Sequence, residues 1–168
     1  MAFDTFVYFE GKNKIDGEST DKEFSAKNAF EIYSFSFGAS NPTTVGSGTG
    51  GLTGGKVSLS SFNIMKKTDA ASAALFQGCA AGTTIEKMVV VLRKAGGDKQ
   101  LKFLTFTFDE VMVESIQWSG SSGGDDSPSE SLSIAFRKVT IAYQPQGNDG
   151  AAKGGEKTAS WDIGTNTK

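Results

Sequence analysis

Histidine is absent from this 168-residue chain, and cysteine occurs once, at Cys79. Without histidine, triads of the Ser-His-Asp or Cys-His kind and histidine-ligated metal sites are excluded. A single cysteine can form neither a disulfide within the chain nor a multi-cysteine metal cluster. Cys79 lies in an alanine-rich segment, where a small buried thiol is the expected role. We therefore expect no catalytic residue, no metal and no cofactor, and a protein that is not an enzyme.

An excess of basic charge and long apolar runs are also lacking. The chain has 17 Lys and Arg against 19 Asp and Glu, a formal net charge of -2. Nucleic-acid binders need a basic face to displace counterions from phosphates, so we expect no nucleic-acid partner. The longest apolar stretch, Met88 to Leu92, is far below the ~18 residues of a membrane span, so we expect no membrane insertion. Met1 to Glu10 lacks the features of a secretory signal, so any export requires a dedicated machine.

Aromatic residues, by contrast, are abundant, and much of the chain alternates with a period of two, which predicts β-strands. Between 30 and 37, Tyr33, Phe35 and Phe37 are predicted to share one face of an antiparallel sheet. The alternation changes phase near three pairs of residues, which predicts bends or bulges there. These pairs are Ser60-Ser61, Asp109-Glu110 and Arg137-Lys138. The candidate strands are 3–9, 30–37, 57–65, 84–94, 100–118, 132–143 and 159–163.

One segment, 69–79, has the pattern of a helix. Thr68 or Asp69 can cap its N-terminus, and Gly78 or Gly82 can end it. Its apolar side chains recur at three- and four-residue spacing and are expected to share a face: Leu75, Phe76 and Cys79.

The elements together predict a mainly β fold in one domain over residues 1–168. We expect an antiparallel β-barrel of two curved sheets, with one short flanking α-helix and a long Gly-rich arm at about 38–56. Loops of that length are uncommon in compact domains and are usually functional or disordered. Val45 and Leu52 are the arm's few large apolar residues, so the arm is either a docking element or an ordinary mobile loop.

One sequence pattern that points to nucleotide binding fails on its context. Gly50 to Lys56 reads GGLTGGK, which fits most of a phosphate-binding loop, but Val57 stands where Ser or Thr should contact magnesium. A strand, not a helix, is predicted to follow, so nucleotide binding is disfavoured. A hydrolase using carboxylates such as Glu110 and Glu114 is a distant alternative.

Several short motifs follow one another in an order that resembles a known family. They comprise an aromatic strand entering the arm, a lysine-then-acid helix start, a hairpin and two strand ends. In this order they resemble the haemolysin-coregulated protein (Hcp) family, the tube subunits of type VI secretion, over essentially the whole chain. One departure is that Ala71-Ser72-Ala73 lacks the proline that the family often has in the first helical turn. The motifs are 33–38 (YSFSFG), 66–69 (KKTD), 93–97 (RKAGG), 143–146 (YQPQ) and 161–163 (WDI).

The resemblance implies that six copies close into a ring and that rings stack into a hollow tube. Such a tube is expelled through the envelope beneath a spike, and its lumen can hold small effectors. The implied partners are further copies of the chain, the spike and sheath components, and effector proteins. The protein would be made in the bacterial cytoplasm and secreted by the type VI machine without a signal peptide. We expect ring stacking to involve Val45, Leu52, Lys56, Gly96 and Gly97.

A binding module remains the main alternative to this interpretation. A monomeric, lipocalin-like barrel would hold a small apolar ligand in a hydrophobic interior cavity, and bulges would shape its mouth.

Overall fold

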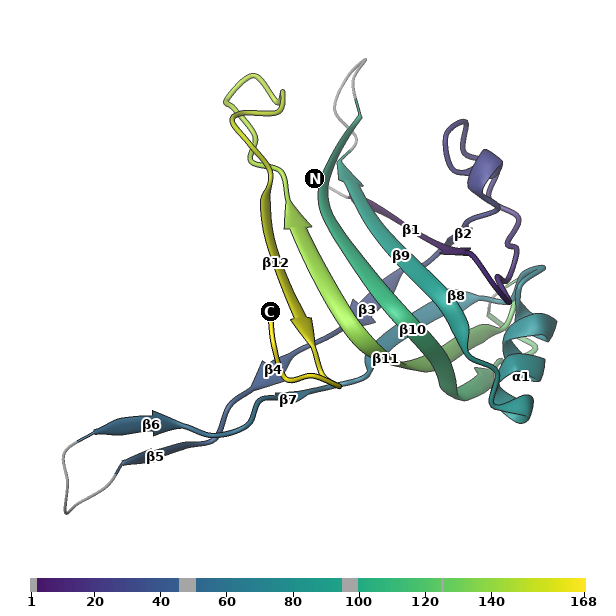
Figure 1. Cartoon of the computed structure of the whole chain (residues 1–168). Coiled ribbons are helices and arrows are strands. Elements are labelled where there is room, and N and C mark those ends of the chain that lie inside the picture. Colours follow the sequence, from purple (N-terminus) through teal and green to yellow (C-terminus); the bar gives the residue numbers. More distant parts are fainter. Residues whose placement is uncertain (1–2, 46–50, 95–99, 125) are drawn as a thin grey trace.

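The computed structural model describes residues 3–45, 51–94, 100–124 and 126–168 (Figure 1). Strands dominate this part of the chain, and a ten-residue α-helix and one 3-10 turn accompany them. The bounds are β1 (Phe3–Glu10), η1 (Ser25–Lys27), β2 (Phe30–Glu31), β3 (Ser34–Ser36), β4 (Ala39–Ser40), β5 (Thr43–Val45), β6 (Leu52–Gly54), β7 (Ser58–Leu59), β8 (Phe62–Lys67), α1 (Ser72–Ala81), β9 (Ile85–Lys94), β10 (Leu101–Ser119), β11 (Ser129–Tyr143) and β12 (Lys157–Asp162).

Eight of the strands form one antiparallel sheet in the order β2-β1-β9-β10-β11-β8-β3, with β12 also paired to β11. β11 pairs with β10 along one edge, but its other edge has two partners. Its first half, 129–134, pairs with β8, and its second half, 138–143, pairs with β12. The sheet therefore forks near Arg137, where the sequence changes phase. The two curved sheets expected from the sequence are parts of one sheet, which divides at β11 into a branch with β8 and β3 and a branch with β12.

The sheet closes into a barrel through the segment 30–36. The Ile32 N–H donates to the Thr5 carbonyl on the β1 side, at 3.1 Å. The next residue, Tyr33, donates to the Met65 carbonyl on the β8 side, also at 3.1 Å. One short piece of chain thus joins the two ends of the sheet, which curls round on itself in Figure 1.

This closure divides the strand predicted over 30–37 into β2 and β3. The chain changes its neighbour between Ile32 and Tyr33, so the simple alternation breaks there. Ile32 is buried, whereas Tyr33 is 54% exposed. The prediction that Tyr33 shares a face with Phe35 and Phe37 is therefore wrong, because the last two pack against the core.

The barrel interior is filled by phenylalanine rings. Phe62, Phe106 and Phe108 lie at its centre, with centroid separations of 4.9 to 6.2 Å, and Phe136 lies 4.8 Å from Phe108. Such packing occupies the space in which a lipocalin-like barrel would hold its ligand. The filled interior therefore disfavours the ligand-binding alternative.

The predicted bend at Asp109-Glu110 is present, but it is made without a shift of register. Glu110 adopts a left-handed conformation with φ of 51°. This turn lets both Phe108 and Val111 point into the barrel, where both are buried. The register shifts of β10 lie elsewhere, between Lys102 and Leu104 against β9 and between Val113 and Ser115 against β11.

The described part of the arm at 38–56 contains two short paired segments. β4 pairs with β7 near the barrel, and β5 pairs with β6 farther out. Figure 1 shows this ribbon leaving the barrel and reaching well beyond it. The described part is thus an ordered element, as the docking interpretation requires.

Helix α1 begins three residues later than predicted. The Ala71 N–H donates to Asp69 Oδ1 at 2.9 Å, and Gly82 ends the helix with φ of 62°. Leu75 and Gly78 are buried against the barrel, but Phe76 is 54% exposed. The prediction that Phe76 shares a face with Leu75 is wrong, because adjacent helical residues point about 100° apart.

A second apolar cluster lies on the outer face of β1 and β9, where the segment containing η1 covers it. Phe6 stacks on Phe24 with ring centroids 4.2 Å apart. The Arg93 guanidinium lies over both rings and binds Asp21, with Nη2 2.6 Å from Oδ2. This ion pair ties the covering segment to the sheet.

Replacing Asp21 by asparagine tests the contribution of the Arg93–Asp21 ion pair to stability. The hydrogen bond from Arg93 lowers the pKa of Asp21 to about 2, so the carboxylate stabilises the fold above its unfolded pKa of 3.8. We expect Asp21→Asn to lower the free energy of unfolding by roughly 2 kcal/mol at pH 7. The difference from the unmodified protein should shrink as the pH falls from about 3.8 through about 2. Urea unfolding at several pH values measures it, and a pH-independent difference would contradict the assignment.

Candidate functional site

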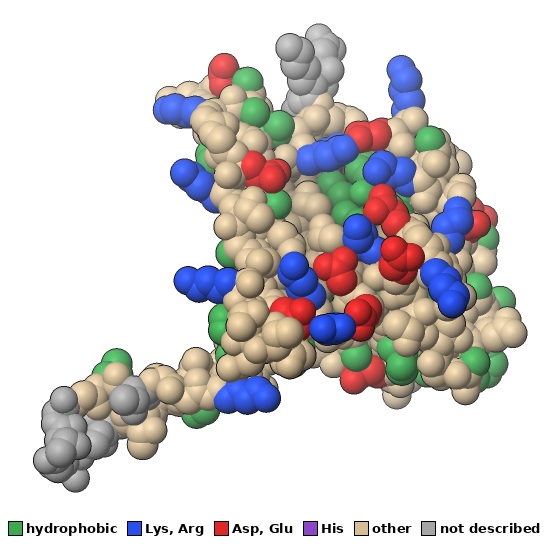
Figure 2. Space-filling view, in the orientation of Figure 1, with side chains coloured by type: hydrophobic (Ala, Val, Ile, Leu, Met, Phe, Trp, Pro, Cys, Tyr) green, Lys and Arg blue, Asp and Glu red, His purple; other side chains and the backbone are tan. Residues whose placement is uncertain are grey.

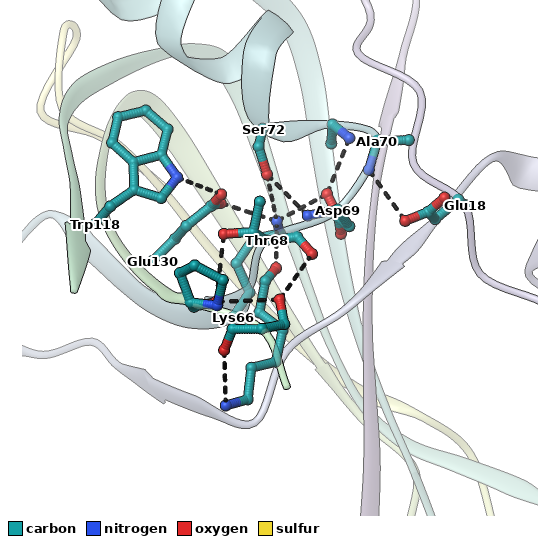
Figure 3. Close-up of polar contacts among 12 residues, drawn as sticks. Glu18, Lys66, Thr68, Asp69, Ala70, Ser72, Trp118 and Glu130 are labelled. Atoms are coloured by element: carbon teal, nitrogen blue, oxygen red, sulfur yellow. Dashed lines mark hydrogen bonds and ion pairs between the residues drawn. The ribbon is translucent and has the colours of Figure 1, made fainter. Parts of the chain in front are cut away.

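A fully buried ion pair connects strands β8 and β11 next to the start of helix α1. Lys66 in β8 and Glu130 in β11 face each other directly in the strand register, and both side chains are 0% exposed. Lys66 Nζ lies 2.9 Å from Glu130 Oε2 and 2.8 Å from Asp69 Oδ1 (Figure 3). The ammonium also donates to the Lys67 carbonyl at 2.8 Å. The lysine-then-acid motif at 66–69 is thus the centre of a charged network.

The remaining oxygen of Glu130 is also bound. The Trp118 indole Nε1–H donates to Glu130 Oε1 at 2.7 Å, so residues from β8, β10, β11 and the start of α1 meet at one carboxylate. Burial raises the pKa of Glu130, but hydrogen bonds from Ser72, Lys66 and Trp118 lower it by more. The carboxylate therefore stays ionised. Since no substrate can reach a fully buried pair, its role is structural.

Of the residues expected to mediate ring stacking, Leu52 has the clearest surface position. It lies in β6 at the outer end of the described arm and is 73% exposed. Val45 pairs with it across the ribbon, so the register brings these two positions together. Lys56 is exposed nearer the barrel, between β6 and β7. Gly96 and Gly97 lie outside the described residues.

The arm differs from the barrel in its charge. Figure 2 shows basic and acidic side chains spread over the visible face of the barrel. Some of them form ion pairs, such as Lys102 with Glu23. Over residues 38–59 the sequence has a single charged residue, Lys56. The arm is therefore a projection with a single charged residue, and among its described side chains the large apolar Leu52 is exposed.

The patterns that pointed to chemistry find no support in the described part of the chain. The segment after Lys56 forms the strand β7, so no helix follows the glycine-rich motif. Glu110 binds Arg137 at 2.9 Å, and Glu114 accepts a hydrogen bond from Ser61 at 2.5 Å, both at the surface. Within the described ranges, no group of three or more His, Cys, Asp or Glu side chains could hold a metal ion. No helix described is long and apolar enough to span a membrane.

Comparison with known proteins identifies the family. A family model described as "Type VI secretion system effector, Hcp" matches residues 6–143. The chain belongs to the Hcp family. Protein hcp1 of Pseudomonas aeruginosa is 34% identical over 113 residues, which cover 67% of this chain and 69% of that protein.

Solved structures of other proteins agree with the match over nearly the full length. The chain is 36% identical to a structure described as that of a type six secretion system protein, with a TM-score of 0.89 and 99% of each chain covered. It is 30% identical to Hcp1 of Salmonella typhimurium, with a TM-score of 0.75 and again 99% of each chain covered. Hcp proteins are structural components of the type VI secretion system and are secreted by it. The expected mainly β, barrel-like fold with a flanking helix is confirmed.

The buried network was missed by sequence reasoning, although a signal for it was present. Lys66 continues the inward alternation of Phe62 and Ile64 in β8. In the same way, Glu130 continues that of the apolar residues 132 and 134 in β11. A charge on the buried face of a strand needs an opposite charge nearby. A lysine and a glutamate at apolar positions of two strand patterns therefore indicate a buried ion pair such as this one.

Removing one member of the pair should cost far more than removing both. We expect Lys66→Met to lower the free energy of unfolding by roughly 3–5 kcal/mol, because Glu130 remains buried without its partner. The double variant Lys66→Met/Glu130→Met should recover most of this loss. Urea unfolding measures both, and Arg137→Met at the exposed ion pair with Glu110 serves as the control, with a change of at most about 1 kcal/mol. Equal losses of unfolding free energy in the single and double variants would contradict this account of the pair.

Proposed function

We propose that this protein is the tube subunit of a type VI secretion machine. Six copies close into a ring, and rings stack into a hollow tube that is expelled through the envelope beneath the spike. The observation that carries the proposal is the arm with its single charge, which leaves the barrel as a paired ribbon and exposes Leu52 near its outer end. In a protein of the Hcp family, such an arm is suited to contact a neighbouring ring.

The energetics of the arm favour a contact that is repeated. Burying a leucine side chain contributes roughly 1.5–3 kcal/mol, which is too little to hold two single copies together. Six arms acting together between two rings multiply this contribution, since the later contacts form at a high effective concentration. The arm therefore stabilises ring-on-ring stacking more than it stabilises a pair of subunits.

The polarity of the subunit fits stacking in one direction. Contacts between unlike surfaces leave an unsatisfied surface at each end, so the assembly continues as a filament. We assign the arm residues Val45, Leu52 and Lys56 to one of these surfaces, and Gly96 and Gly97, between β9 and β10 in the sequence, to a rim contact. Residues 1–168 act as one unit in this assembly.

The expected partners and localisation follow from the proposed tube. Sheath and spike components are the partners outside and at the tip, and small effector proteins travel in the lumen. The protein is made in the bacterial cytoplasm and leaves it through the machine itself. Ser34 and Ser36 in β3 are exposed and give that strand a small, polar outward face, as a wetted surface requires.

The decisive measurement is the solution mass of the purified protein by light scattering, together with electron microscopy. A mass of six chains and ring-shaped particles would support the proposal. A monomer at high concentration would contradict it.

Changing Leu52 separates stacking from ring closure. We expect Leu52→Asp to leave the six-chain mass unchanged but to abolish tubes in electron micrographs and protein in the culture medium, because a charge replaces the apolar contact. Leu52→Met, which keeps an apolar side chain of similar volume, should retain both. If Leu52→Asp forms tubes and is secreted normally, the arm does not act through this residue.

A further inference from the structure

The outward face of α1 has no charge. Its buried residues are Ser72, Leu75 and Gly78, and no Asp, Glu, Lys or Arg occurs among its ten residues, although such residues make up 21% of the chain. A helix on a free surface normally turns charged side chains to solvent, whereas a helix that is apolar all round is buried. The exposed residues of α1, which we call the helix face, are Ala73, Ala74, Phe76, Gln77, Ala80 and Ala81.

A neighbouring indole extends the helix face. Phe76 is 54% exposed and Trp118, at the end of β10, is 45% exposed, with ring centroids 5.9 Å apart. The hydrogen bond to Glu130 fixes the Trp118 side chain, so this pair is a rigid aromatic projection. Rigid, exposed aromatic residues are the typical anchors of protein–protein interfaces.

A second uncharged surface lies at the base of the arm. It is an apolar groove of about 230 Å³, smaller than the roughly 300–1,000 Å³ of typical small-molecule pockets. This size suits protein side chains better than a separate ligand. We call it the arm-base groove, and its principal lining residues are Phe37, Val57, Leu59, Ile141, Ala159 and Trp161.

The two surfaces lie on different flanks of the barrel. In Figure 1, α1 is at one side of the sheet, and β12 with the base of the arm is at the other. A ring with one repeated contact needs two unlike, complementary surfaces placed in this way on every copy. We propose that the helix face of one copy packs into the arm-base groove of the next and that this contact closes the ring. This inference rests on the proposed function and names the surfaces that the ring uses.

One pair of substitutions tests the helix face at matched exposure. Phe76→Lys places a charge in the contact, and Tyr33→Lys places one at an equally exposed aromatic position outside both surfaces. We expect Phe76→Lys to weaken association at least about 30-fold, as loss of an interface anchor does, and to reduce the six-chain mass. Tyr33→Lys should keep that mass. A Phe76→Lys protein with an unchanged six-chain mass would overturn the inference.

Cross-linking tests the pairing itself with small changes that preserve the fold. In a Cys79→Ala background, Ala80→Cys marks the helix face and Ala159→Cys marks the groove. A chain that carries both should give a ladder of up to six subunits with a short bis-maleimide, because each copy contributes one of each surface. A mixture of the two single variants should give linked pairs only across unlike copies, and each variant alone should give none.

The outcomes distinguish this inference from the proposed function. If the unmodified protein is a six-chain ring but the double variant gives no ladder, the ring stands and the assigned surfaces are wrong. Cross-linking by either single variant alone would show a contact between like surfaces and would also overturn the inference. A monomeric unmodified protein would overturn the inference and the proposed function together.

Discussion

The buried ion pair between Lys66 and Glu130 is the constraint on which much of the structure depends. Two opposite charges at 0% exposure are tolerable only if every donor and acceptor around them is satisfied inside the protein. Asp69 and Ser72 at the start of α1, together with Trp118 from β10, complete that set. The relative positions of β8, β11, the end of β10 and α1 are therefore linked, because moving any of them would leave a buried charge incompletely paired.

The same network connects the interior to the surface through which copies are proposed to meet. Trp118 donates its indole hydrogen to Glu130 and presents its ring to solvent beside Phe76. An internal charge thus orients an external apolar contact. This arrangement reduces the side-chain entropy lost on association, because the indole is already held before a neighbour arrives.

Ring closure and ring stacking are assigned to different parts of one small barrel. The helix face and the arm-base groove lie on the flanks, whereas Leu52 lies at the outer end of the arm. Separate surfaces allow rings to form first and to stack afterwards. Because the surfaces proposed to meet are unlike, the proposed stacking has a direction.

The period-two runs, the Gly-rich arm and the order of short motifs are local properties, and the sequence by itself determined from them the mainly β class, the flanking helix and the family. Partners distant in the sequence decided the rest. The segment 30–37 reads as one strand, but it divides because Ile32 pairs with β1 and Tyr33 pairs with β8. Leu75 and Phe76 are predicted to share a face of the helix, but packing buried Leu75 against the barrel and left Phe76 exposed. Only the register of β8 against β11 brings Lys66 to Glu130, because pairing between strands is set by contacts across the whole sheet and not by neighbours in the chain.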